Sequence, residues 1–152
     1  MSRKILPKAR EMIRSGQMDA LSLGKKKYDL YLEPVCRQYD LTRNELDVLL
    51  CLANNPDFDR AADIVHIRKM AKSHVSLSVT NLEQRGLLTR EFDPDDRRTA
   101  HLKLTDTARE IAAKGARCQE AFFSRIFEGL SREELDLWRS LLDRVCVNIS
   151  QM

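Results

Sequence analysis

The sequence has 152 residues, of which 43% are hydrophobic and 32% charged, and its formal net charge is +3. This balance favours a folded chain over a disordered one, and the length suits one domain with appended helices. The longest apolar run covers only Val48 to Ala53, whereas a membrane helix needs about 20 residues. Lys4, Lys8 and Arg10 interrupt the first residues, so we expect no signal peptide, no membrane partner and a cytoplasmic location.

Charge is spread unevenly along the chain. Residues 1–28 carry eight Lys and Arg against two acids, and residues 29–59 carry two against seven. Residues 60–105 carry nine against six and hold all three histidines. A basic N-terminus and a modestly basic middle are compatible with a polyphosphate partner such as DNA.

The sequence contains no residue pattern typical of a metal site or a catalytic centre. The histidines lack the spacing of a zinc site: they are His66, His74 and His101. The acidic turn at 93–96 is not a calcium loop, because Arg98 and Leu104 stand where that loop needs glycine and glutamate. No serine or cysteine forms a recognisable arrangement with histidine. We therefore expect no metal, no cofactor and no enzymatic activity.

The cysteines are expected to be reduced residues of the core. They contain no CxxC pair and fall in helix-like stretches: Cys36, Cys51, Cys118 and Cys146. The sequence leaves open whether any of them senses redox state.

The first part of the chain predicts helices. Residues 1–17 should form a short amphipathic helix or a loose arm ending near Gly16. A longer helix should run from about Asp19 to Tyr39, because apolar residues recur there at steps of three and four. Pro34 should kink this helix or remove one of its hydrogen bonds.

A capping box marks the start of the next helix. Thr42 and Glu45 can each bond the other's main-chain amide, and Leu41 and Leu46 take the flanking staple positions. This helix should end before Pro56.

Two short helices and a hairpin follow. Asp59 is the expected cap of the first, with Ala62, Ile64 and Val65 among its buried residues. The second should span Ser73 to Arg85, be capped by Ser73, and end at a left-handed Gly86. Its apolar face is Val75, Val79 and Leu82. Strands are expected at Leu87–Phe92 and Arg98–Leu104, around a tight turn at 93–96.

Helical periodicity returns from Thr105 and continues to Ile126. A second capping box, Ser131 with Glu134, begins the last helix. That helix carries an apolar seam typical of helix pairing: Leu135, Trp138, Leu142, Val145 and Ile149.

This order predicts a mainly α protein with a small β-hairpin wing, a winged helix-turn-helix with N- and C-terminal dimerisation helices. In such folds the helix after the turn enters the major groove, and the hairpin reaches the flanking backbone or minor groove. The expected domains are 1–40 for dimerisation, 41–105 for DNA binding and 106–152 for dimerisation.

Over about residues 41–112 the sequence resembles the multiple-antibiotic-resistance regulator (MarR) family. The resemblance rests on an ordered set of motifs: Lys72-Ser73-His74-Val75-Ser76, Leu82 to Leu88, Arg90, Asp93 to Arg98, and Leu104-Thr105. It implies a homodimeric transcription regulator, a repressor or an activator, that binds double-stranded operator DNA with an inverted repeat. It also implies a small apolar or phenolic effector bound between the dimer and DNA domains.

The resemblance implies that Arg98 enters the minor groove and that Asp96 orients it. The residues expected to contact DNA are Lys72, Ser73, His74, Ser76, Leu77, Thr80, Arg90, Arg97 and Arg98. Two positions depart from the family, which often has basic residues where this chain has Leu77 and Asn81. Fewer cations suggest weaker phosphate attraction, or contact between Leu77 and a thymine methyl group.

Some questions stay open at this level. Aromatic residues could line an effector pocket, although a core role is favoured: Tyr28, Tyr31, Tyr39, Phe122 and Trp138. The peroxide-sensing branch of the family has an early cysteine, but this chain has Ser15 near that position, which disfavours that mechanism. The alternatives are a winged-helix module that binds a protein partner, or a thiol or metal sensor on the same scaffold. The operator, the effector, its binding residues and the regulated genes are not specified by the sequence.

Overall fold

The structure is a computed structural model that describes residues 6–152, with side chains from residue 9 onward. The chain divides into two compact units, Met1–Gln119 and Glu120–Met152.

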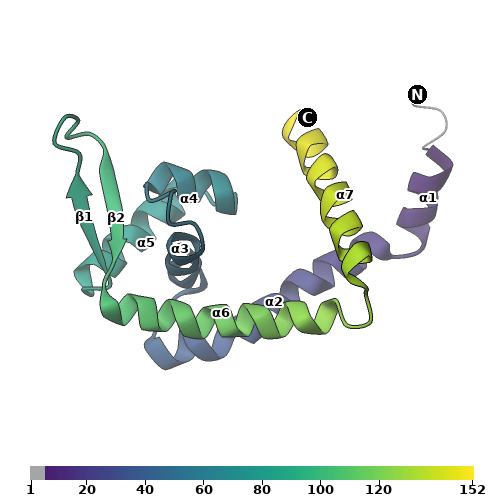
Figure 1. The fold of residues 1–152 in the computed structure, drawn as a ribbon, viewed down its shortest axis with the longest axis horizontal. Helices are drawn as coiled ribbons and strands as arrows, with labels where there is room; N and C mark the ends of the chain where they lie inside the picture. The colour runs from purple at the N-terminus through teal and green to yellow at the C-terminus, as the bar shows by residue number, and fades with distance from the viewer. Residues whose placement is uncertain (1–5) are drawn as a thin grey trace. The chain divides into compact units, whose positions relative to one another are not determined.

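The elements follow the predicted order, helices interrupted by one β-hairpin (Figure 1). Before the hairpin lie α1 (Leu6–Arg14), α2 (Gln17–Tyr39), α3 (Arg43–Asn54), α4 (Ala61–Arg68) and α5 (Lys72–Gln84). The hairpin and later helices are β1 (Leu88–Phe92), β2 (Ala100–Leu104), α6 (Asp106–Ile126) and α7 (Arg132–Ser150). The fold class predicted from the sequence is confirmed.

Both predicted capping boxes are present. At the start of α3, Thr42 Oγ1 accepts a hydrogen bond from the Glu45 amide at 3.2 Å, and Glu45 Oε2 accepts from the Thr42 amide at 2.8 Å. Ser131 and Glu134 form the same reciprocal pair at the start of α7. Each box satisfies two amides that the first turn of a helix cannot pair internally.

Other helix starts differ from the prediction. Asp59 does not cap α4; the cap position is Arg60, whose amide donates to the carboxylate of Asp63 at 3.0 Å. Helix α5 begins after Ala71 without a side-chain cap, so Ser73 lies inside the first turn. Hydrogen-bond acceptors do lie near both helix starts in the sequence. The sequence does not reveal, however, that the Asp59 carboxylate instead contacts Lys103 and His101 of β2.

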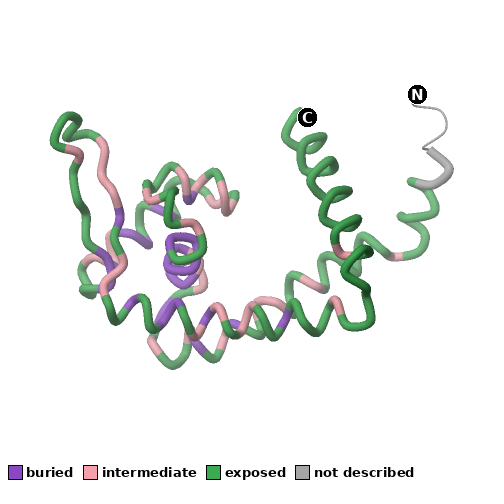
Figure 2. Tube along the Cα trace, in the orientation of Figure 1, coloured by how far each residue is buried: buried purple, intermediate pink, exposed green. Residues whose placement is uncertain are grey.

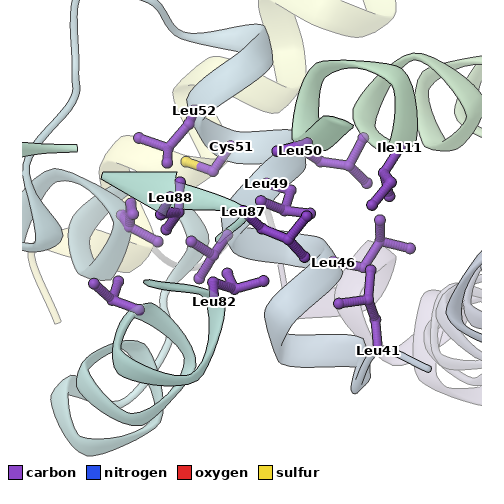
Figure 3. Packing of buried hydrophobic residues seen from close by; sticks show 14 of the residues in the cluster. Leu41, Leu46, Leu49, Leu50, Cys51, Leu52, Leu82, Leu87, Leu88 and Ile111 are labelled. Carbon is purple, nitrogen blue, oxygen red and sulfur yellow. The ribbon is translucent and has the colours of Figure 1, made fainter. Parts of the chain in front are cut away.

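The core of the first unit lies between α3, α5, the hairpin and α6 (Figure 3). Val75, Val79 and Leu82 are at most 1% exposed, which confirms the predicted inner face of α5. In α4, Ile64 is buried as expected, whereas Ala62 is exposed. The purple tube of Figure 2 shows how strongly burial gathers on α3.

The hairpin is antiparallel and runs from the pair Leu88 and Leu104 at its base to Phe92 and Ala100 at its outer end. Its strands are shorter than predicted, because residues 93–99 form the connection between them. Side chains of directly paired residues lie on the same face of a sheet. Leu88 and Leu102 therefore share the face that packs on the core, and they are 1% and 3% exposed.

In the second unit, α7 has no buried residue, and Figure 2 draws it as exposed almost throughout. Its apolar seam is formed as predicted, yet Trp138, Leu142, Val145 and Ile149 are each at least 40% exposed. Phe127 contacts Trp138 edge-on, with ring centroids 5.3 Å apart. Among the described residues, no helix is long and apolar enough to cross a membrane.

Candidate nucleic-acid interface

The outer face of α5 carries the residues expected to contact DNA. Because Val75 and Val79 anchor the opposite face, the first two turns present polar side chains outward. Thr80 is half-buried, and the other expected contacts on this helix are exposed: Lys72, Ser73, His74, Ser76 and Leu77. Leu77 is 62% exposed, so its side chain is accessible for contact with a thymine methyl group. The Thr80 hydroxyl donates to the carbonyl of Ser76 at 3.0 Å.

The other end of α5 is fixed by polar contacts to the junction between α2 and α3. Asn81 Nδ2 donates to Glu45 Oε1 at 3.1 Å, and Glu45 is only 4% exposed. The Arg85 guanidinium donates to the main-chain carbonyls of Tyr39 and Asp40 at 2.6 and 2.7 Å. These bonds set the position of the helix whose first turns carry the exposed residues.

This arrangement gives Asn81 a different role from the one considered from sequence. By its sequence alone, Asn81 is a position where a cation is missing from the DNA-contacting surface. Its amide instead bonds the buried carboxylate of Glu45. The sequence pattern around Glu45 predicts only its role as a helix cap. Nothing near it in the sequence indicates that its carboxylate also accepts a hydrogen bond from Asn81.

The turn of the wing is organised by Asp96. Asp96 Oδ1 accepts from the main-chain amide of Arg98 at 3.0 Å, and Oδ2 accepts from Thr99 Oγ1 at 2.9 Å. These two hydrogen bonds stabilise the carboxylate and lower the pKa of Asp96 below its usual value.

The contact between Asp96 and Arg98 therefore differs from the one expected. The resemblance had suggested that the carboxylate orients the side chain of Arg98. The structure places the carboxylate on the main chain of Arg98, and the ion pairs within residues 9–152 include neither Arg97 nor Arg98. Both arginines are exposed.

Arg90 lies closer to the base of the hairpin than Arg97 and Arg98 do. Its Nε donates to Glu83 Oε2 at 2.9 Å, which links β1 to α5. The side chain is 34% exposed. A contact between Arg90 and DNA would therefore compete with, or be shared with, this ion pair.

A polar clamp holds β2 to the segment before α4. Asp59 accepts from Lys103 Nζ at 2.9 Å and lies 2.6 Å from His101 Nδ1, and its main-chain carbonyl accepts from the Leu102 amide at 2.7 Å. Partial burial would raise the pKa of Asp59, but the hydrogen bonds and charges of Lys103 and His101 outweigh it and lower the pKa. The clamp joins residues more than 40 positions apart, so the sequence pattern could not reveal it.

The cysteines match the expected core role in part. Cys51 is buried and Cys36 and Cys118 are half-buried, but Cys146 on α7 is exposed. Burial raises the thiol pKa of Cys36 and of Cys51, which disfavours the reactive thiolate form. No cluster of three or more potential metal ligands occurs in the described part of the chain.

The aromatic residues considered from sequence differ in how far they are buried. Tyr28 and Tyr39 pack against the core of the first unit. The Tyr28 hydroxyl accepts from Gln119 Nε2 at 2.6 Å, and the Arg43 guanidinium lies 5.4 Å from its ring centroid. Trp138, by contrast, is 44% exposed.

Comparison with known sequences finds one family model and several related transcription regulators. A family model described as the MarR family matches residues 39–99, which contain α3, α4, α5 and β1 and end just before β2. The transcriptional regulator HosA of Escherichia coli O111:H- is 26% identical over 106 residues, covering 70% of this chain and 78% of HosA.

Solved structures share the fold at low sequence identity. A Listeria monocytogenes regulator described as a MarR family member, complexed with 26mer DNA, has a TM-score of 0.78 and 17% identity, with 89% of each chain covered. CouR from Rhodococcus jostii RHA1, bound to p-coumaroyl-CoA, has a TM-score of 0.67 and 22% identity, with 88% of this chain and 87% of CouR covered. These structures show that the chain has the same fold as both proteins.

Proposed function

We propose that this chain is a transcription regulator of the MarR family, whose model matches residues 39–99, and that it binds an inverted-repeat operator as a homodimer. One observation carries the proposal: the exposed first turns of α5 and the arginine-bearing wing project from one shared core. A helix for the major groove beside a hairpin for the flanking DNA is the arrangement that winged helix-turn-helix proteins use.

The homodimer is supported by the surface of α7. An apolar seam that is 40% or more exposed at four positions is unusual on a monomeric protein. We propose that residues 1–40 and 106–152 supply the dimer contacts and that residues 41–105 bind DNA. A two-fold axis through the dimer would then place two copies of α5 on two half-sites.

The DNA contacts divide by chemistry. Ser76 and Leu77 are proposed to contact base edges, since both lie on the outer face of α5. Lys72, at its N-terminus, is proposed to contact phosphate, together with Ser73, His74 and Thr80. Arg97 and Arg98 are proposed to reach the backbone and the minor groove, with Arg90 as a further cationic contact.

A small ligand is proposed to control binding. CouR is bound to p-coumaroyl-CoA, and a small apolar or phenolic effector is proposed here by analogy. The relatives are transcription regulators, and we propose that this protein likewise acts on DNA in the cytoplasm without catalytic activity.

Selection of bound sequences from random DNA tests the function directly. The purified protein should enrich an inverted repeat whose half-sites lie about 10 base pairs apart, one helical turn. Its affinity should fall with rising salt, because neutralised phosphates release counterions. Failure to enrich any sequence, together with salt-independent or absent binding, would favour the protein-interaction module instead.

A further inference from the structure

Phe92 is an aromatic residue on the wing that lies beyond the core. It ends β1 and is 58% exposed. Its register partner is Ala100, whose small side chain leaves the ring uncovered. A single exposed apolar residue is ordinary on a protein surface; what distinguishes Phe92 is the position of its ring.

Phe92 lies on the same face of the hairpin as the residues that pack on the core. Alternate residues of a strand share a face, so Leu88, Arg90 and Phe92 follow one another outward. The first is buried and the last is exposed. The face of β1 that begins at the core with Leu88 thus passes through Arg90 and ends at the outer end of the hairpin with Phe92.

This face borders the space between the wing and α5. A groove of about 360 Å³ is lined by Lys72 and Ser76 of α5 and by Arg90 and Ala100 of the hairpin. Arg90 is two residues from Phe92, and Ala100 is its cross-strand partner. Phe92 therefore stands just beyond the outer end of a groove that has the DNA-contacting face of α5 as one wall.

A second hollow touches the ring itself. It has a volume of about 650 Å³ and is lined by Phe92, Asp93, Pro94 and Arg97. The Asp93 carboxylate accepts from the Asp95 amide at 2.9 Å, so a main-chain contact already engages this acid. An aromatic ring, a proline and an arginine suit a strand of deoxyribose and phosphate, which offers both apolar and anionic groups.

The charge of the wing argues for an apolar contribution. Residues 90–98 contain three arginines and four acids, so their formal charge is −1. Attraction to phosphate alone is a weak basis for holding such a segment on DNA. Apolar wedges are a known alternative in the minor groove, where proteins insert residues such as phenylalanine and proline.

We propose that Phe92 is an apolar DNA contact of this protein, packing its ring on the deoxyribose wall of the minor groove beside each half-site. The proposal rests on the proposed function, because it requires operator binding by α5 and the wing. It places Phe92 in the interface as an apolar contact, distinct from the ionic contacts of Arg97 and Arg98.

Phe92→Ala and Phe92→Leu form the matched pair for the test, with operator DNA obtained by selection. Phe92→Ala should lower operator affinity roughly tenfold, as expected for loss of a buried aromatic contact. The salt dependence should keep its native slope, because no phosphate contact is lost. Phe92→Leu should retain most of the affinity, since it keeps an apolar side chain. Thermal unfolding of both variants should match the native protein.

Hydroxyl-radical footprinting provides a second readout, because the radical attacks deoxyribose hydrogens that face the minor groove. Phe92→Ala should lose protection only beside the half-sites. If the native protein binds the operator and Phe92→Ala binds equally well with an unchanged footprint, Phe92 is not a contact and the proposed function still holds. If the native protein binds no DNA, both proposals are wrong. A Phe92→Ala variant that loses affinity through a lower salt slope would show an ionic effect and would also overturn the assignment.

Discussion

Asn81 donates its side-chain amide to Glu45 at 3.1 Å, and through this bond α5 is fixed to the beginning of α3. The same carboxylate caps α3 through the Thr42 amide. One buried group thus serves two helices, and its second partner lies 36 residues away. The position of α5 therefore depends on a side chain of α3 that is not among the expected DNA contacts.

Replacing Asn81 with alanine tests this dependence. Alanine has the higher helix propensity, so local reasoning predicts a small gain in stability. Loss of a partner for the buried Glu45 carboxylate predicts the opposite, a cost of about 1–3 kcal/mol. Denaturant unfolding decides between these signs. Gln84→Ala, at an exposed site on the same helix, is the control and should change stability little.

Two substitutions in the wing should lower operator affinity for different physical reasons. Arg98→Ala should weaken binding by about 1–3 kcal/mol and reduce the salt slope by about one phosphate-equivalent. Asp96→Ala should weaken it less, because the turn that carries Arg98 loses its acceptor. Affinities measured at several salt concentrations separate the two effects.

Thr99→Val is the matched control for Asp96, because it removes only the hydroxyl that bonds the carboxylate. It should reproduce part of the loss caused by Asp96→Ala. Simple Coulomb repulsion predicts instead that Asp96→Ala binds DNA more tightly. Tighter binding would show that the acid is only a repulsive surface charge.

The outer face of α5 should govern sequence preference. Substitution of Ser76 or Leu77 should change which bases are enriched at defined positions of the half-site, while non-specific affinity changes little. Leu77→Ala should weaken the preference for thymine, whose methyl group the leucine side chain can contact. Repeating the random-DNA selection with each variant provides the measurement. An unchanged consensus in both variants would place base contact elsewhere.

The seam of α7 should hold a stable dimer. Leu142→Glu introduces a charge into the seam and should produce a species near the chain mass of 17.6 kDa in sedimentation experiments. Ser140→Glu is the control, since at about 100° per residue it lies on the opposite side of the helix from Leu142. A native protein that sediments as a monomer at micromolar concentration would contradict the proposed assembly.

Asp59 should contribute to the stability of the folded protein, and this contribution should be lost in acid. Its pKa is lowered in the folded protein, so the folded state favours the charged form. The stabilisation is present above the unfolded pKa of about 3.9 and is lost as pH falls through the lower folded value. Unfolding free energies of the native protein and Asp59→Asn should differ at neutral pH and converge in this acid range. A difference that does not depend on pH would assign the effect to packing.

The sequence by itself determined the order of the elements, because the signals for that order are local. Apolar periodicity placed the helices, and the boxes at Thr42 and Ser131 fixed two of their starts. Paired motifs around the wing identified the family. Even the inner face of α5 followed from the spacing of Val75 and Val79.

Only the tertiary structure decided which polar groups meet. Asp59 had the chemistry of a helix cap, but the hairpin brings Lys103 and His101 to its carboxylate. Asn81 had the pattern of a surface position, but α3 offers it a buried carboxylate. Such pairs have no sequence period, because a hydrogen bond between distant segments depends on how the core orients them.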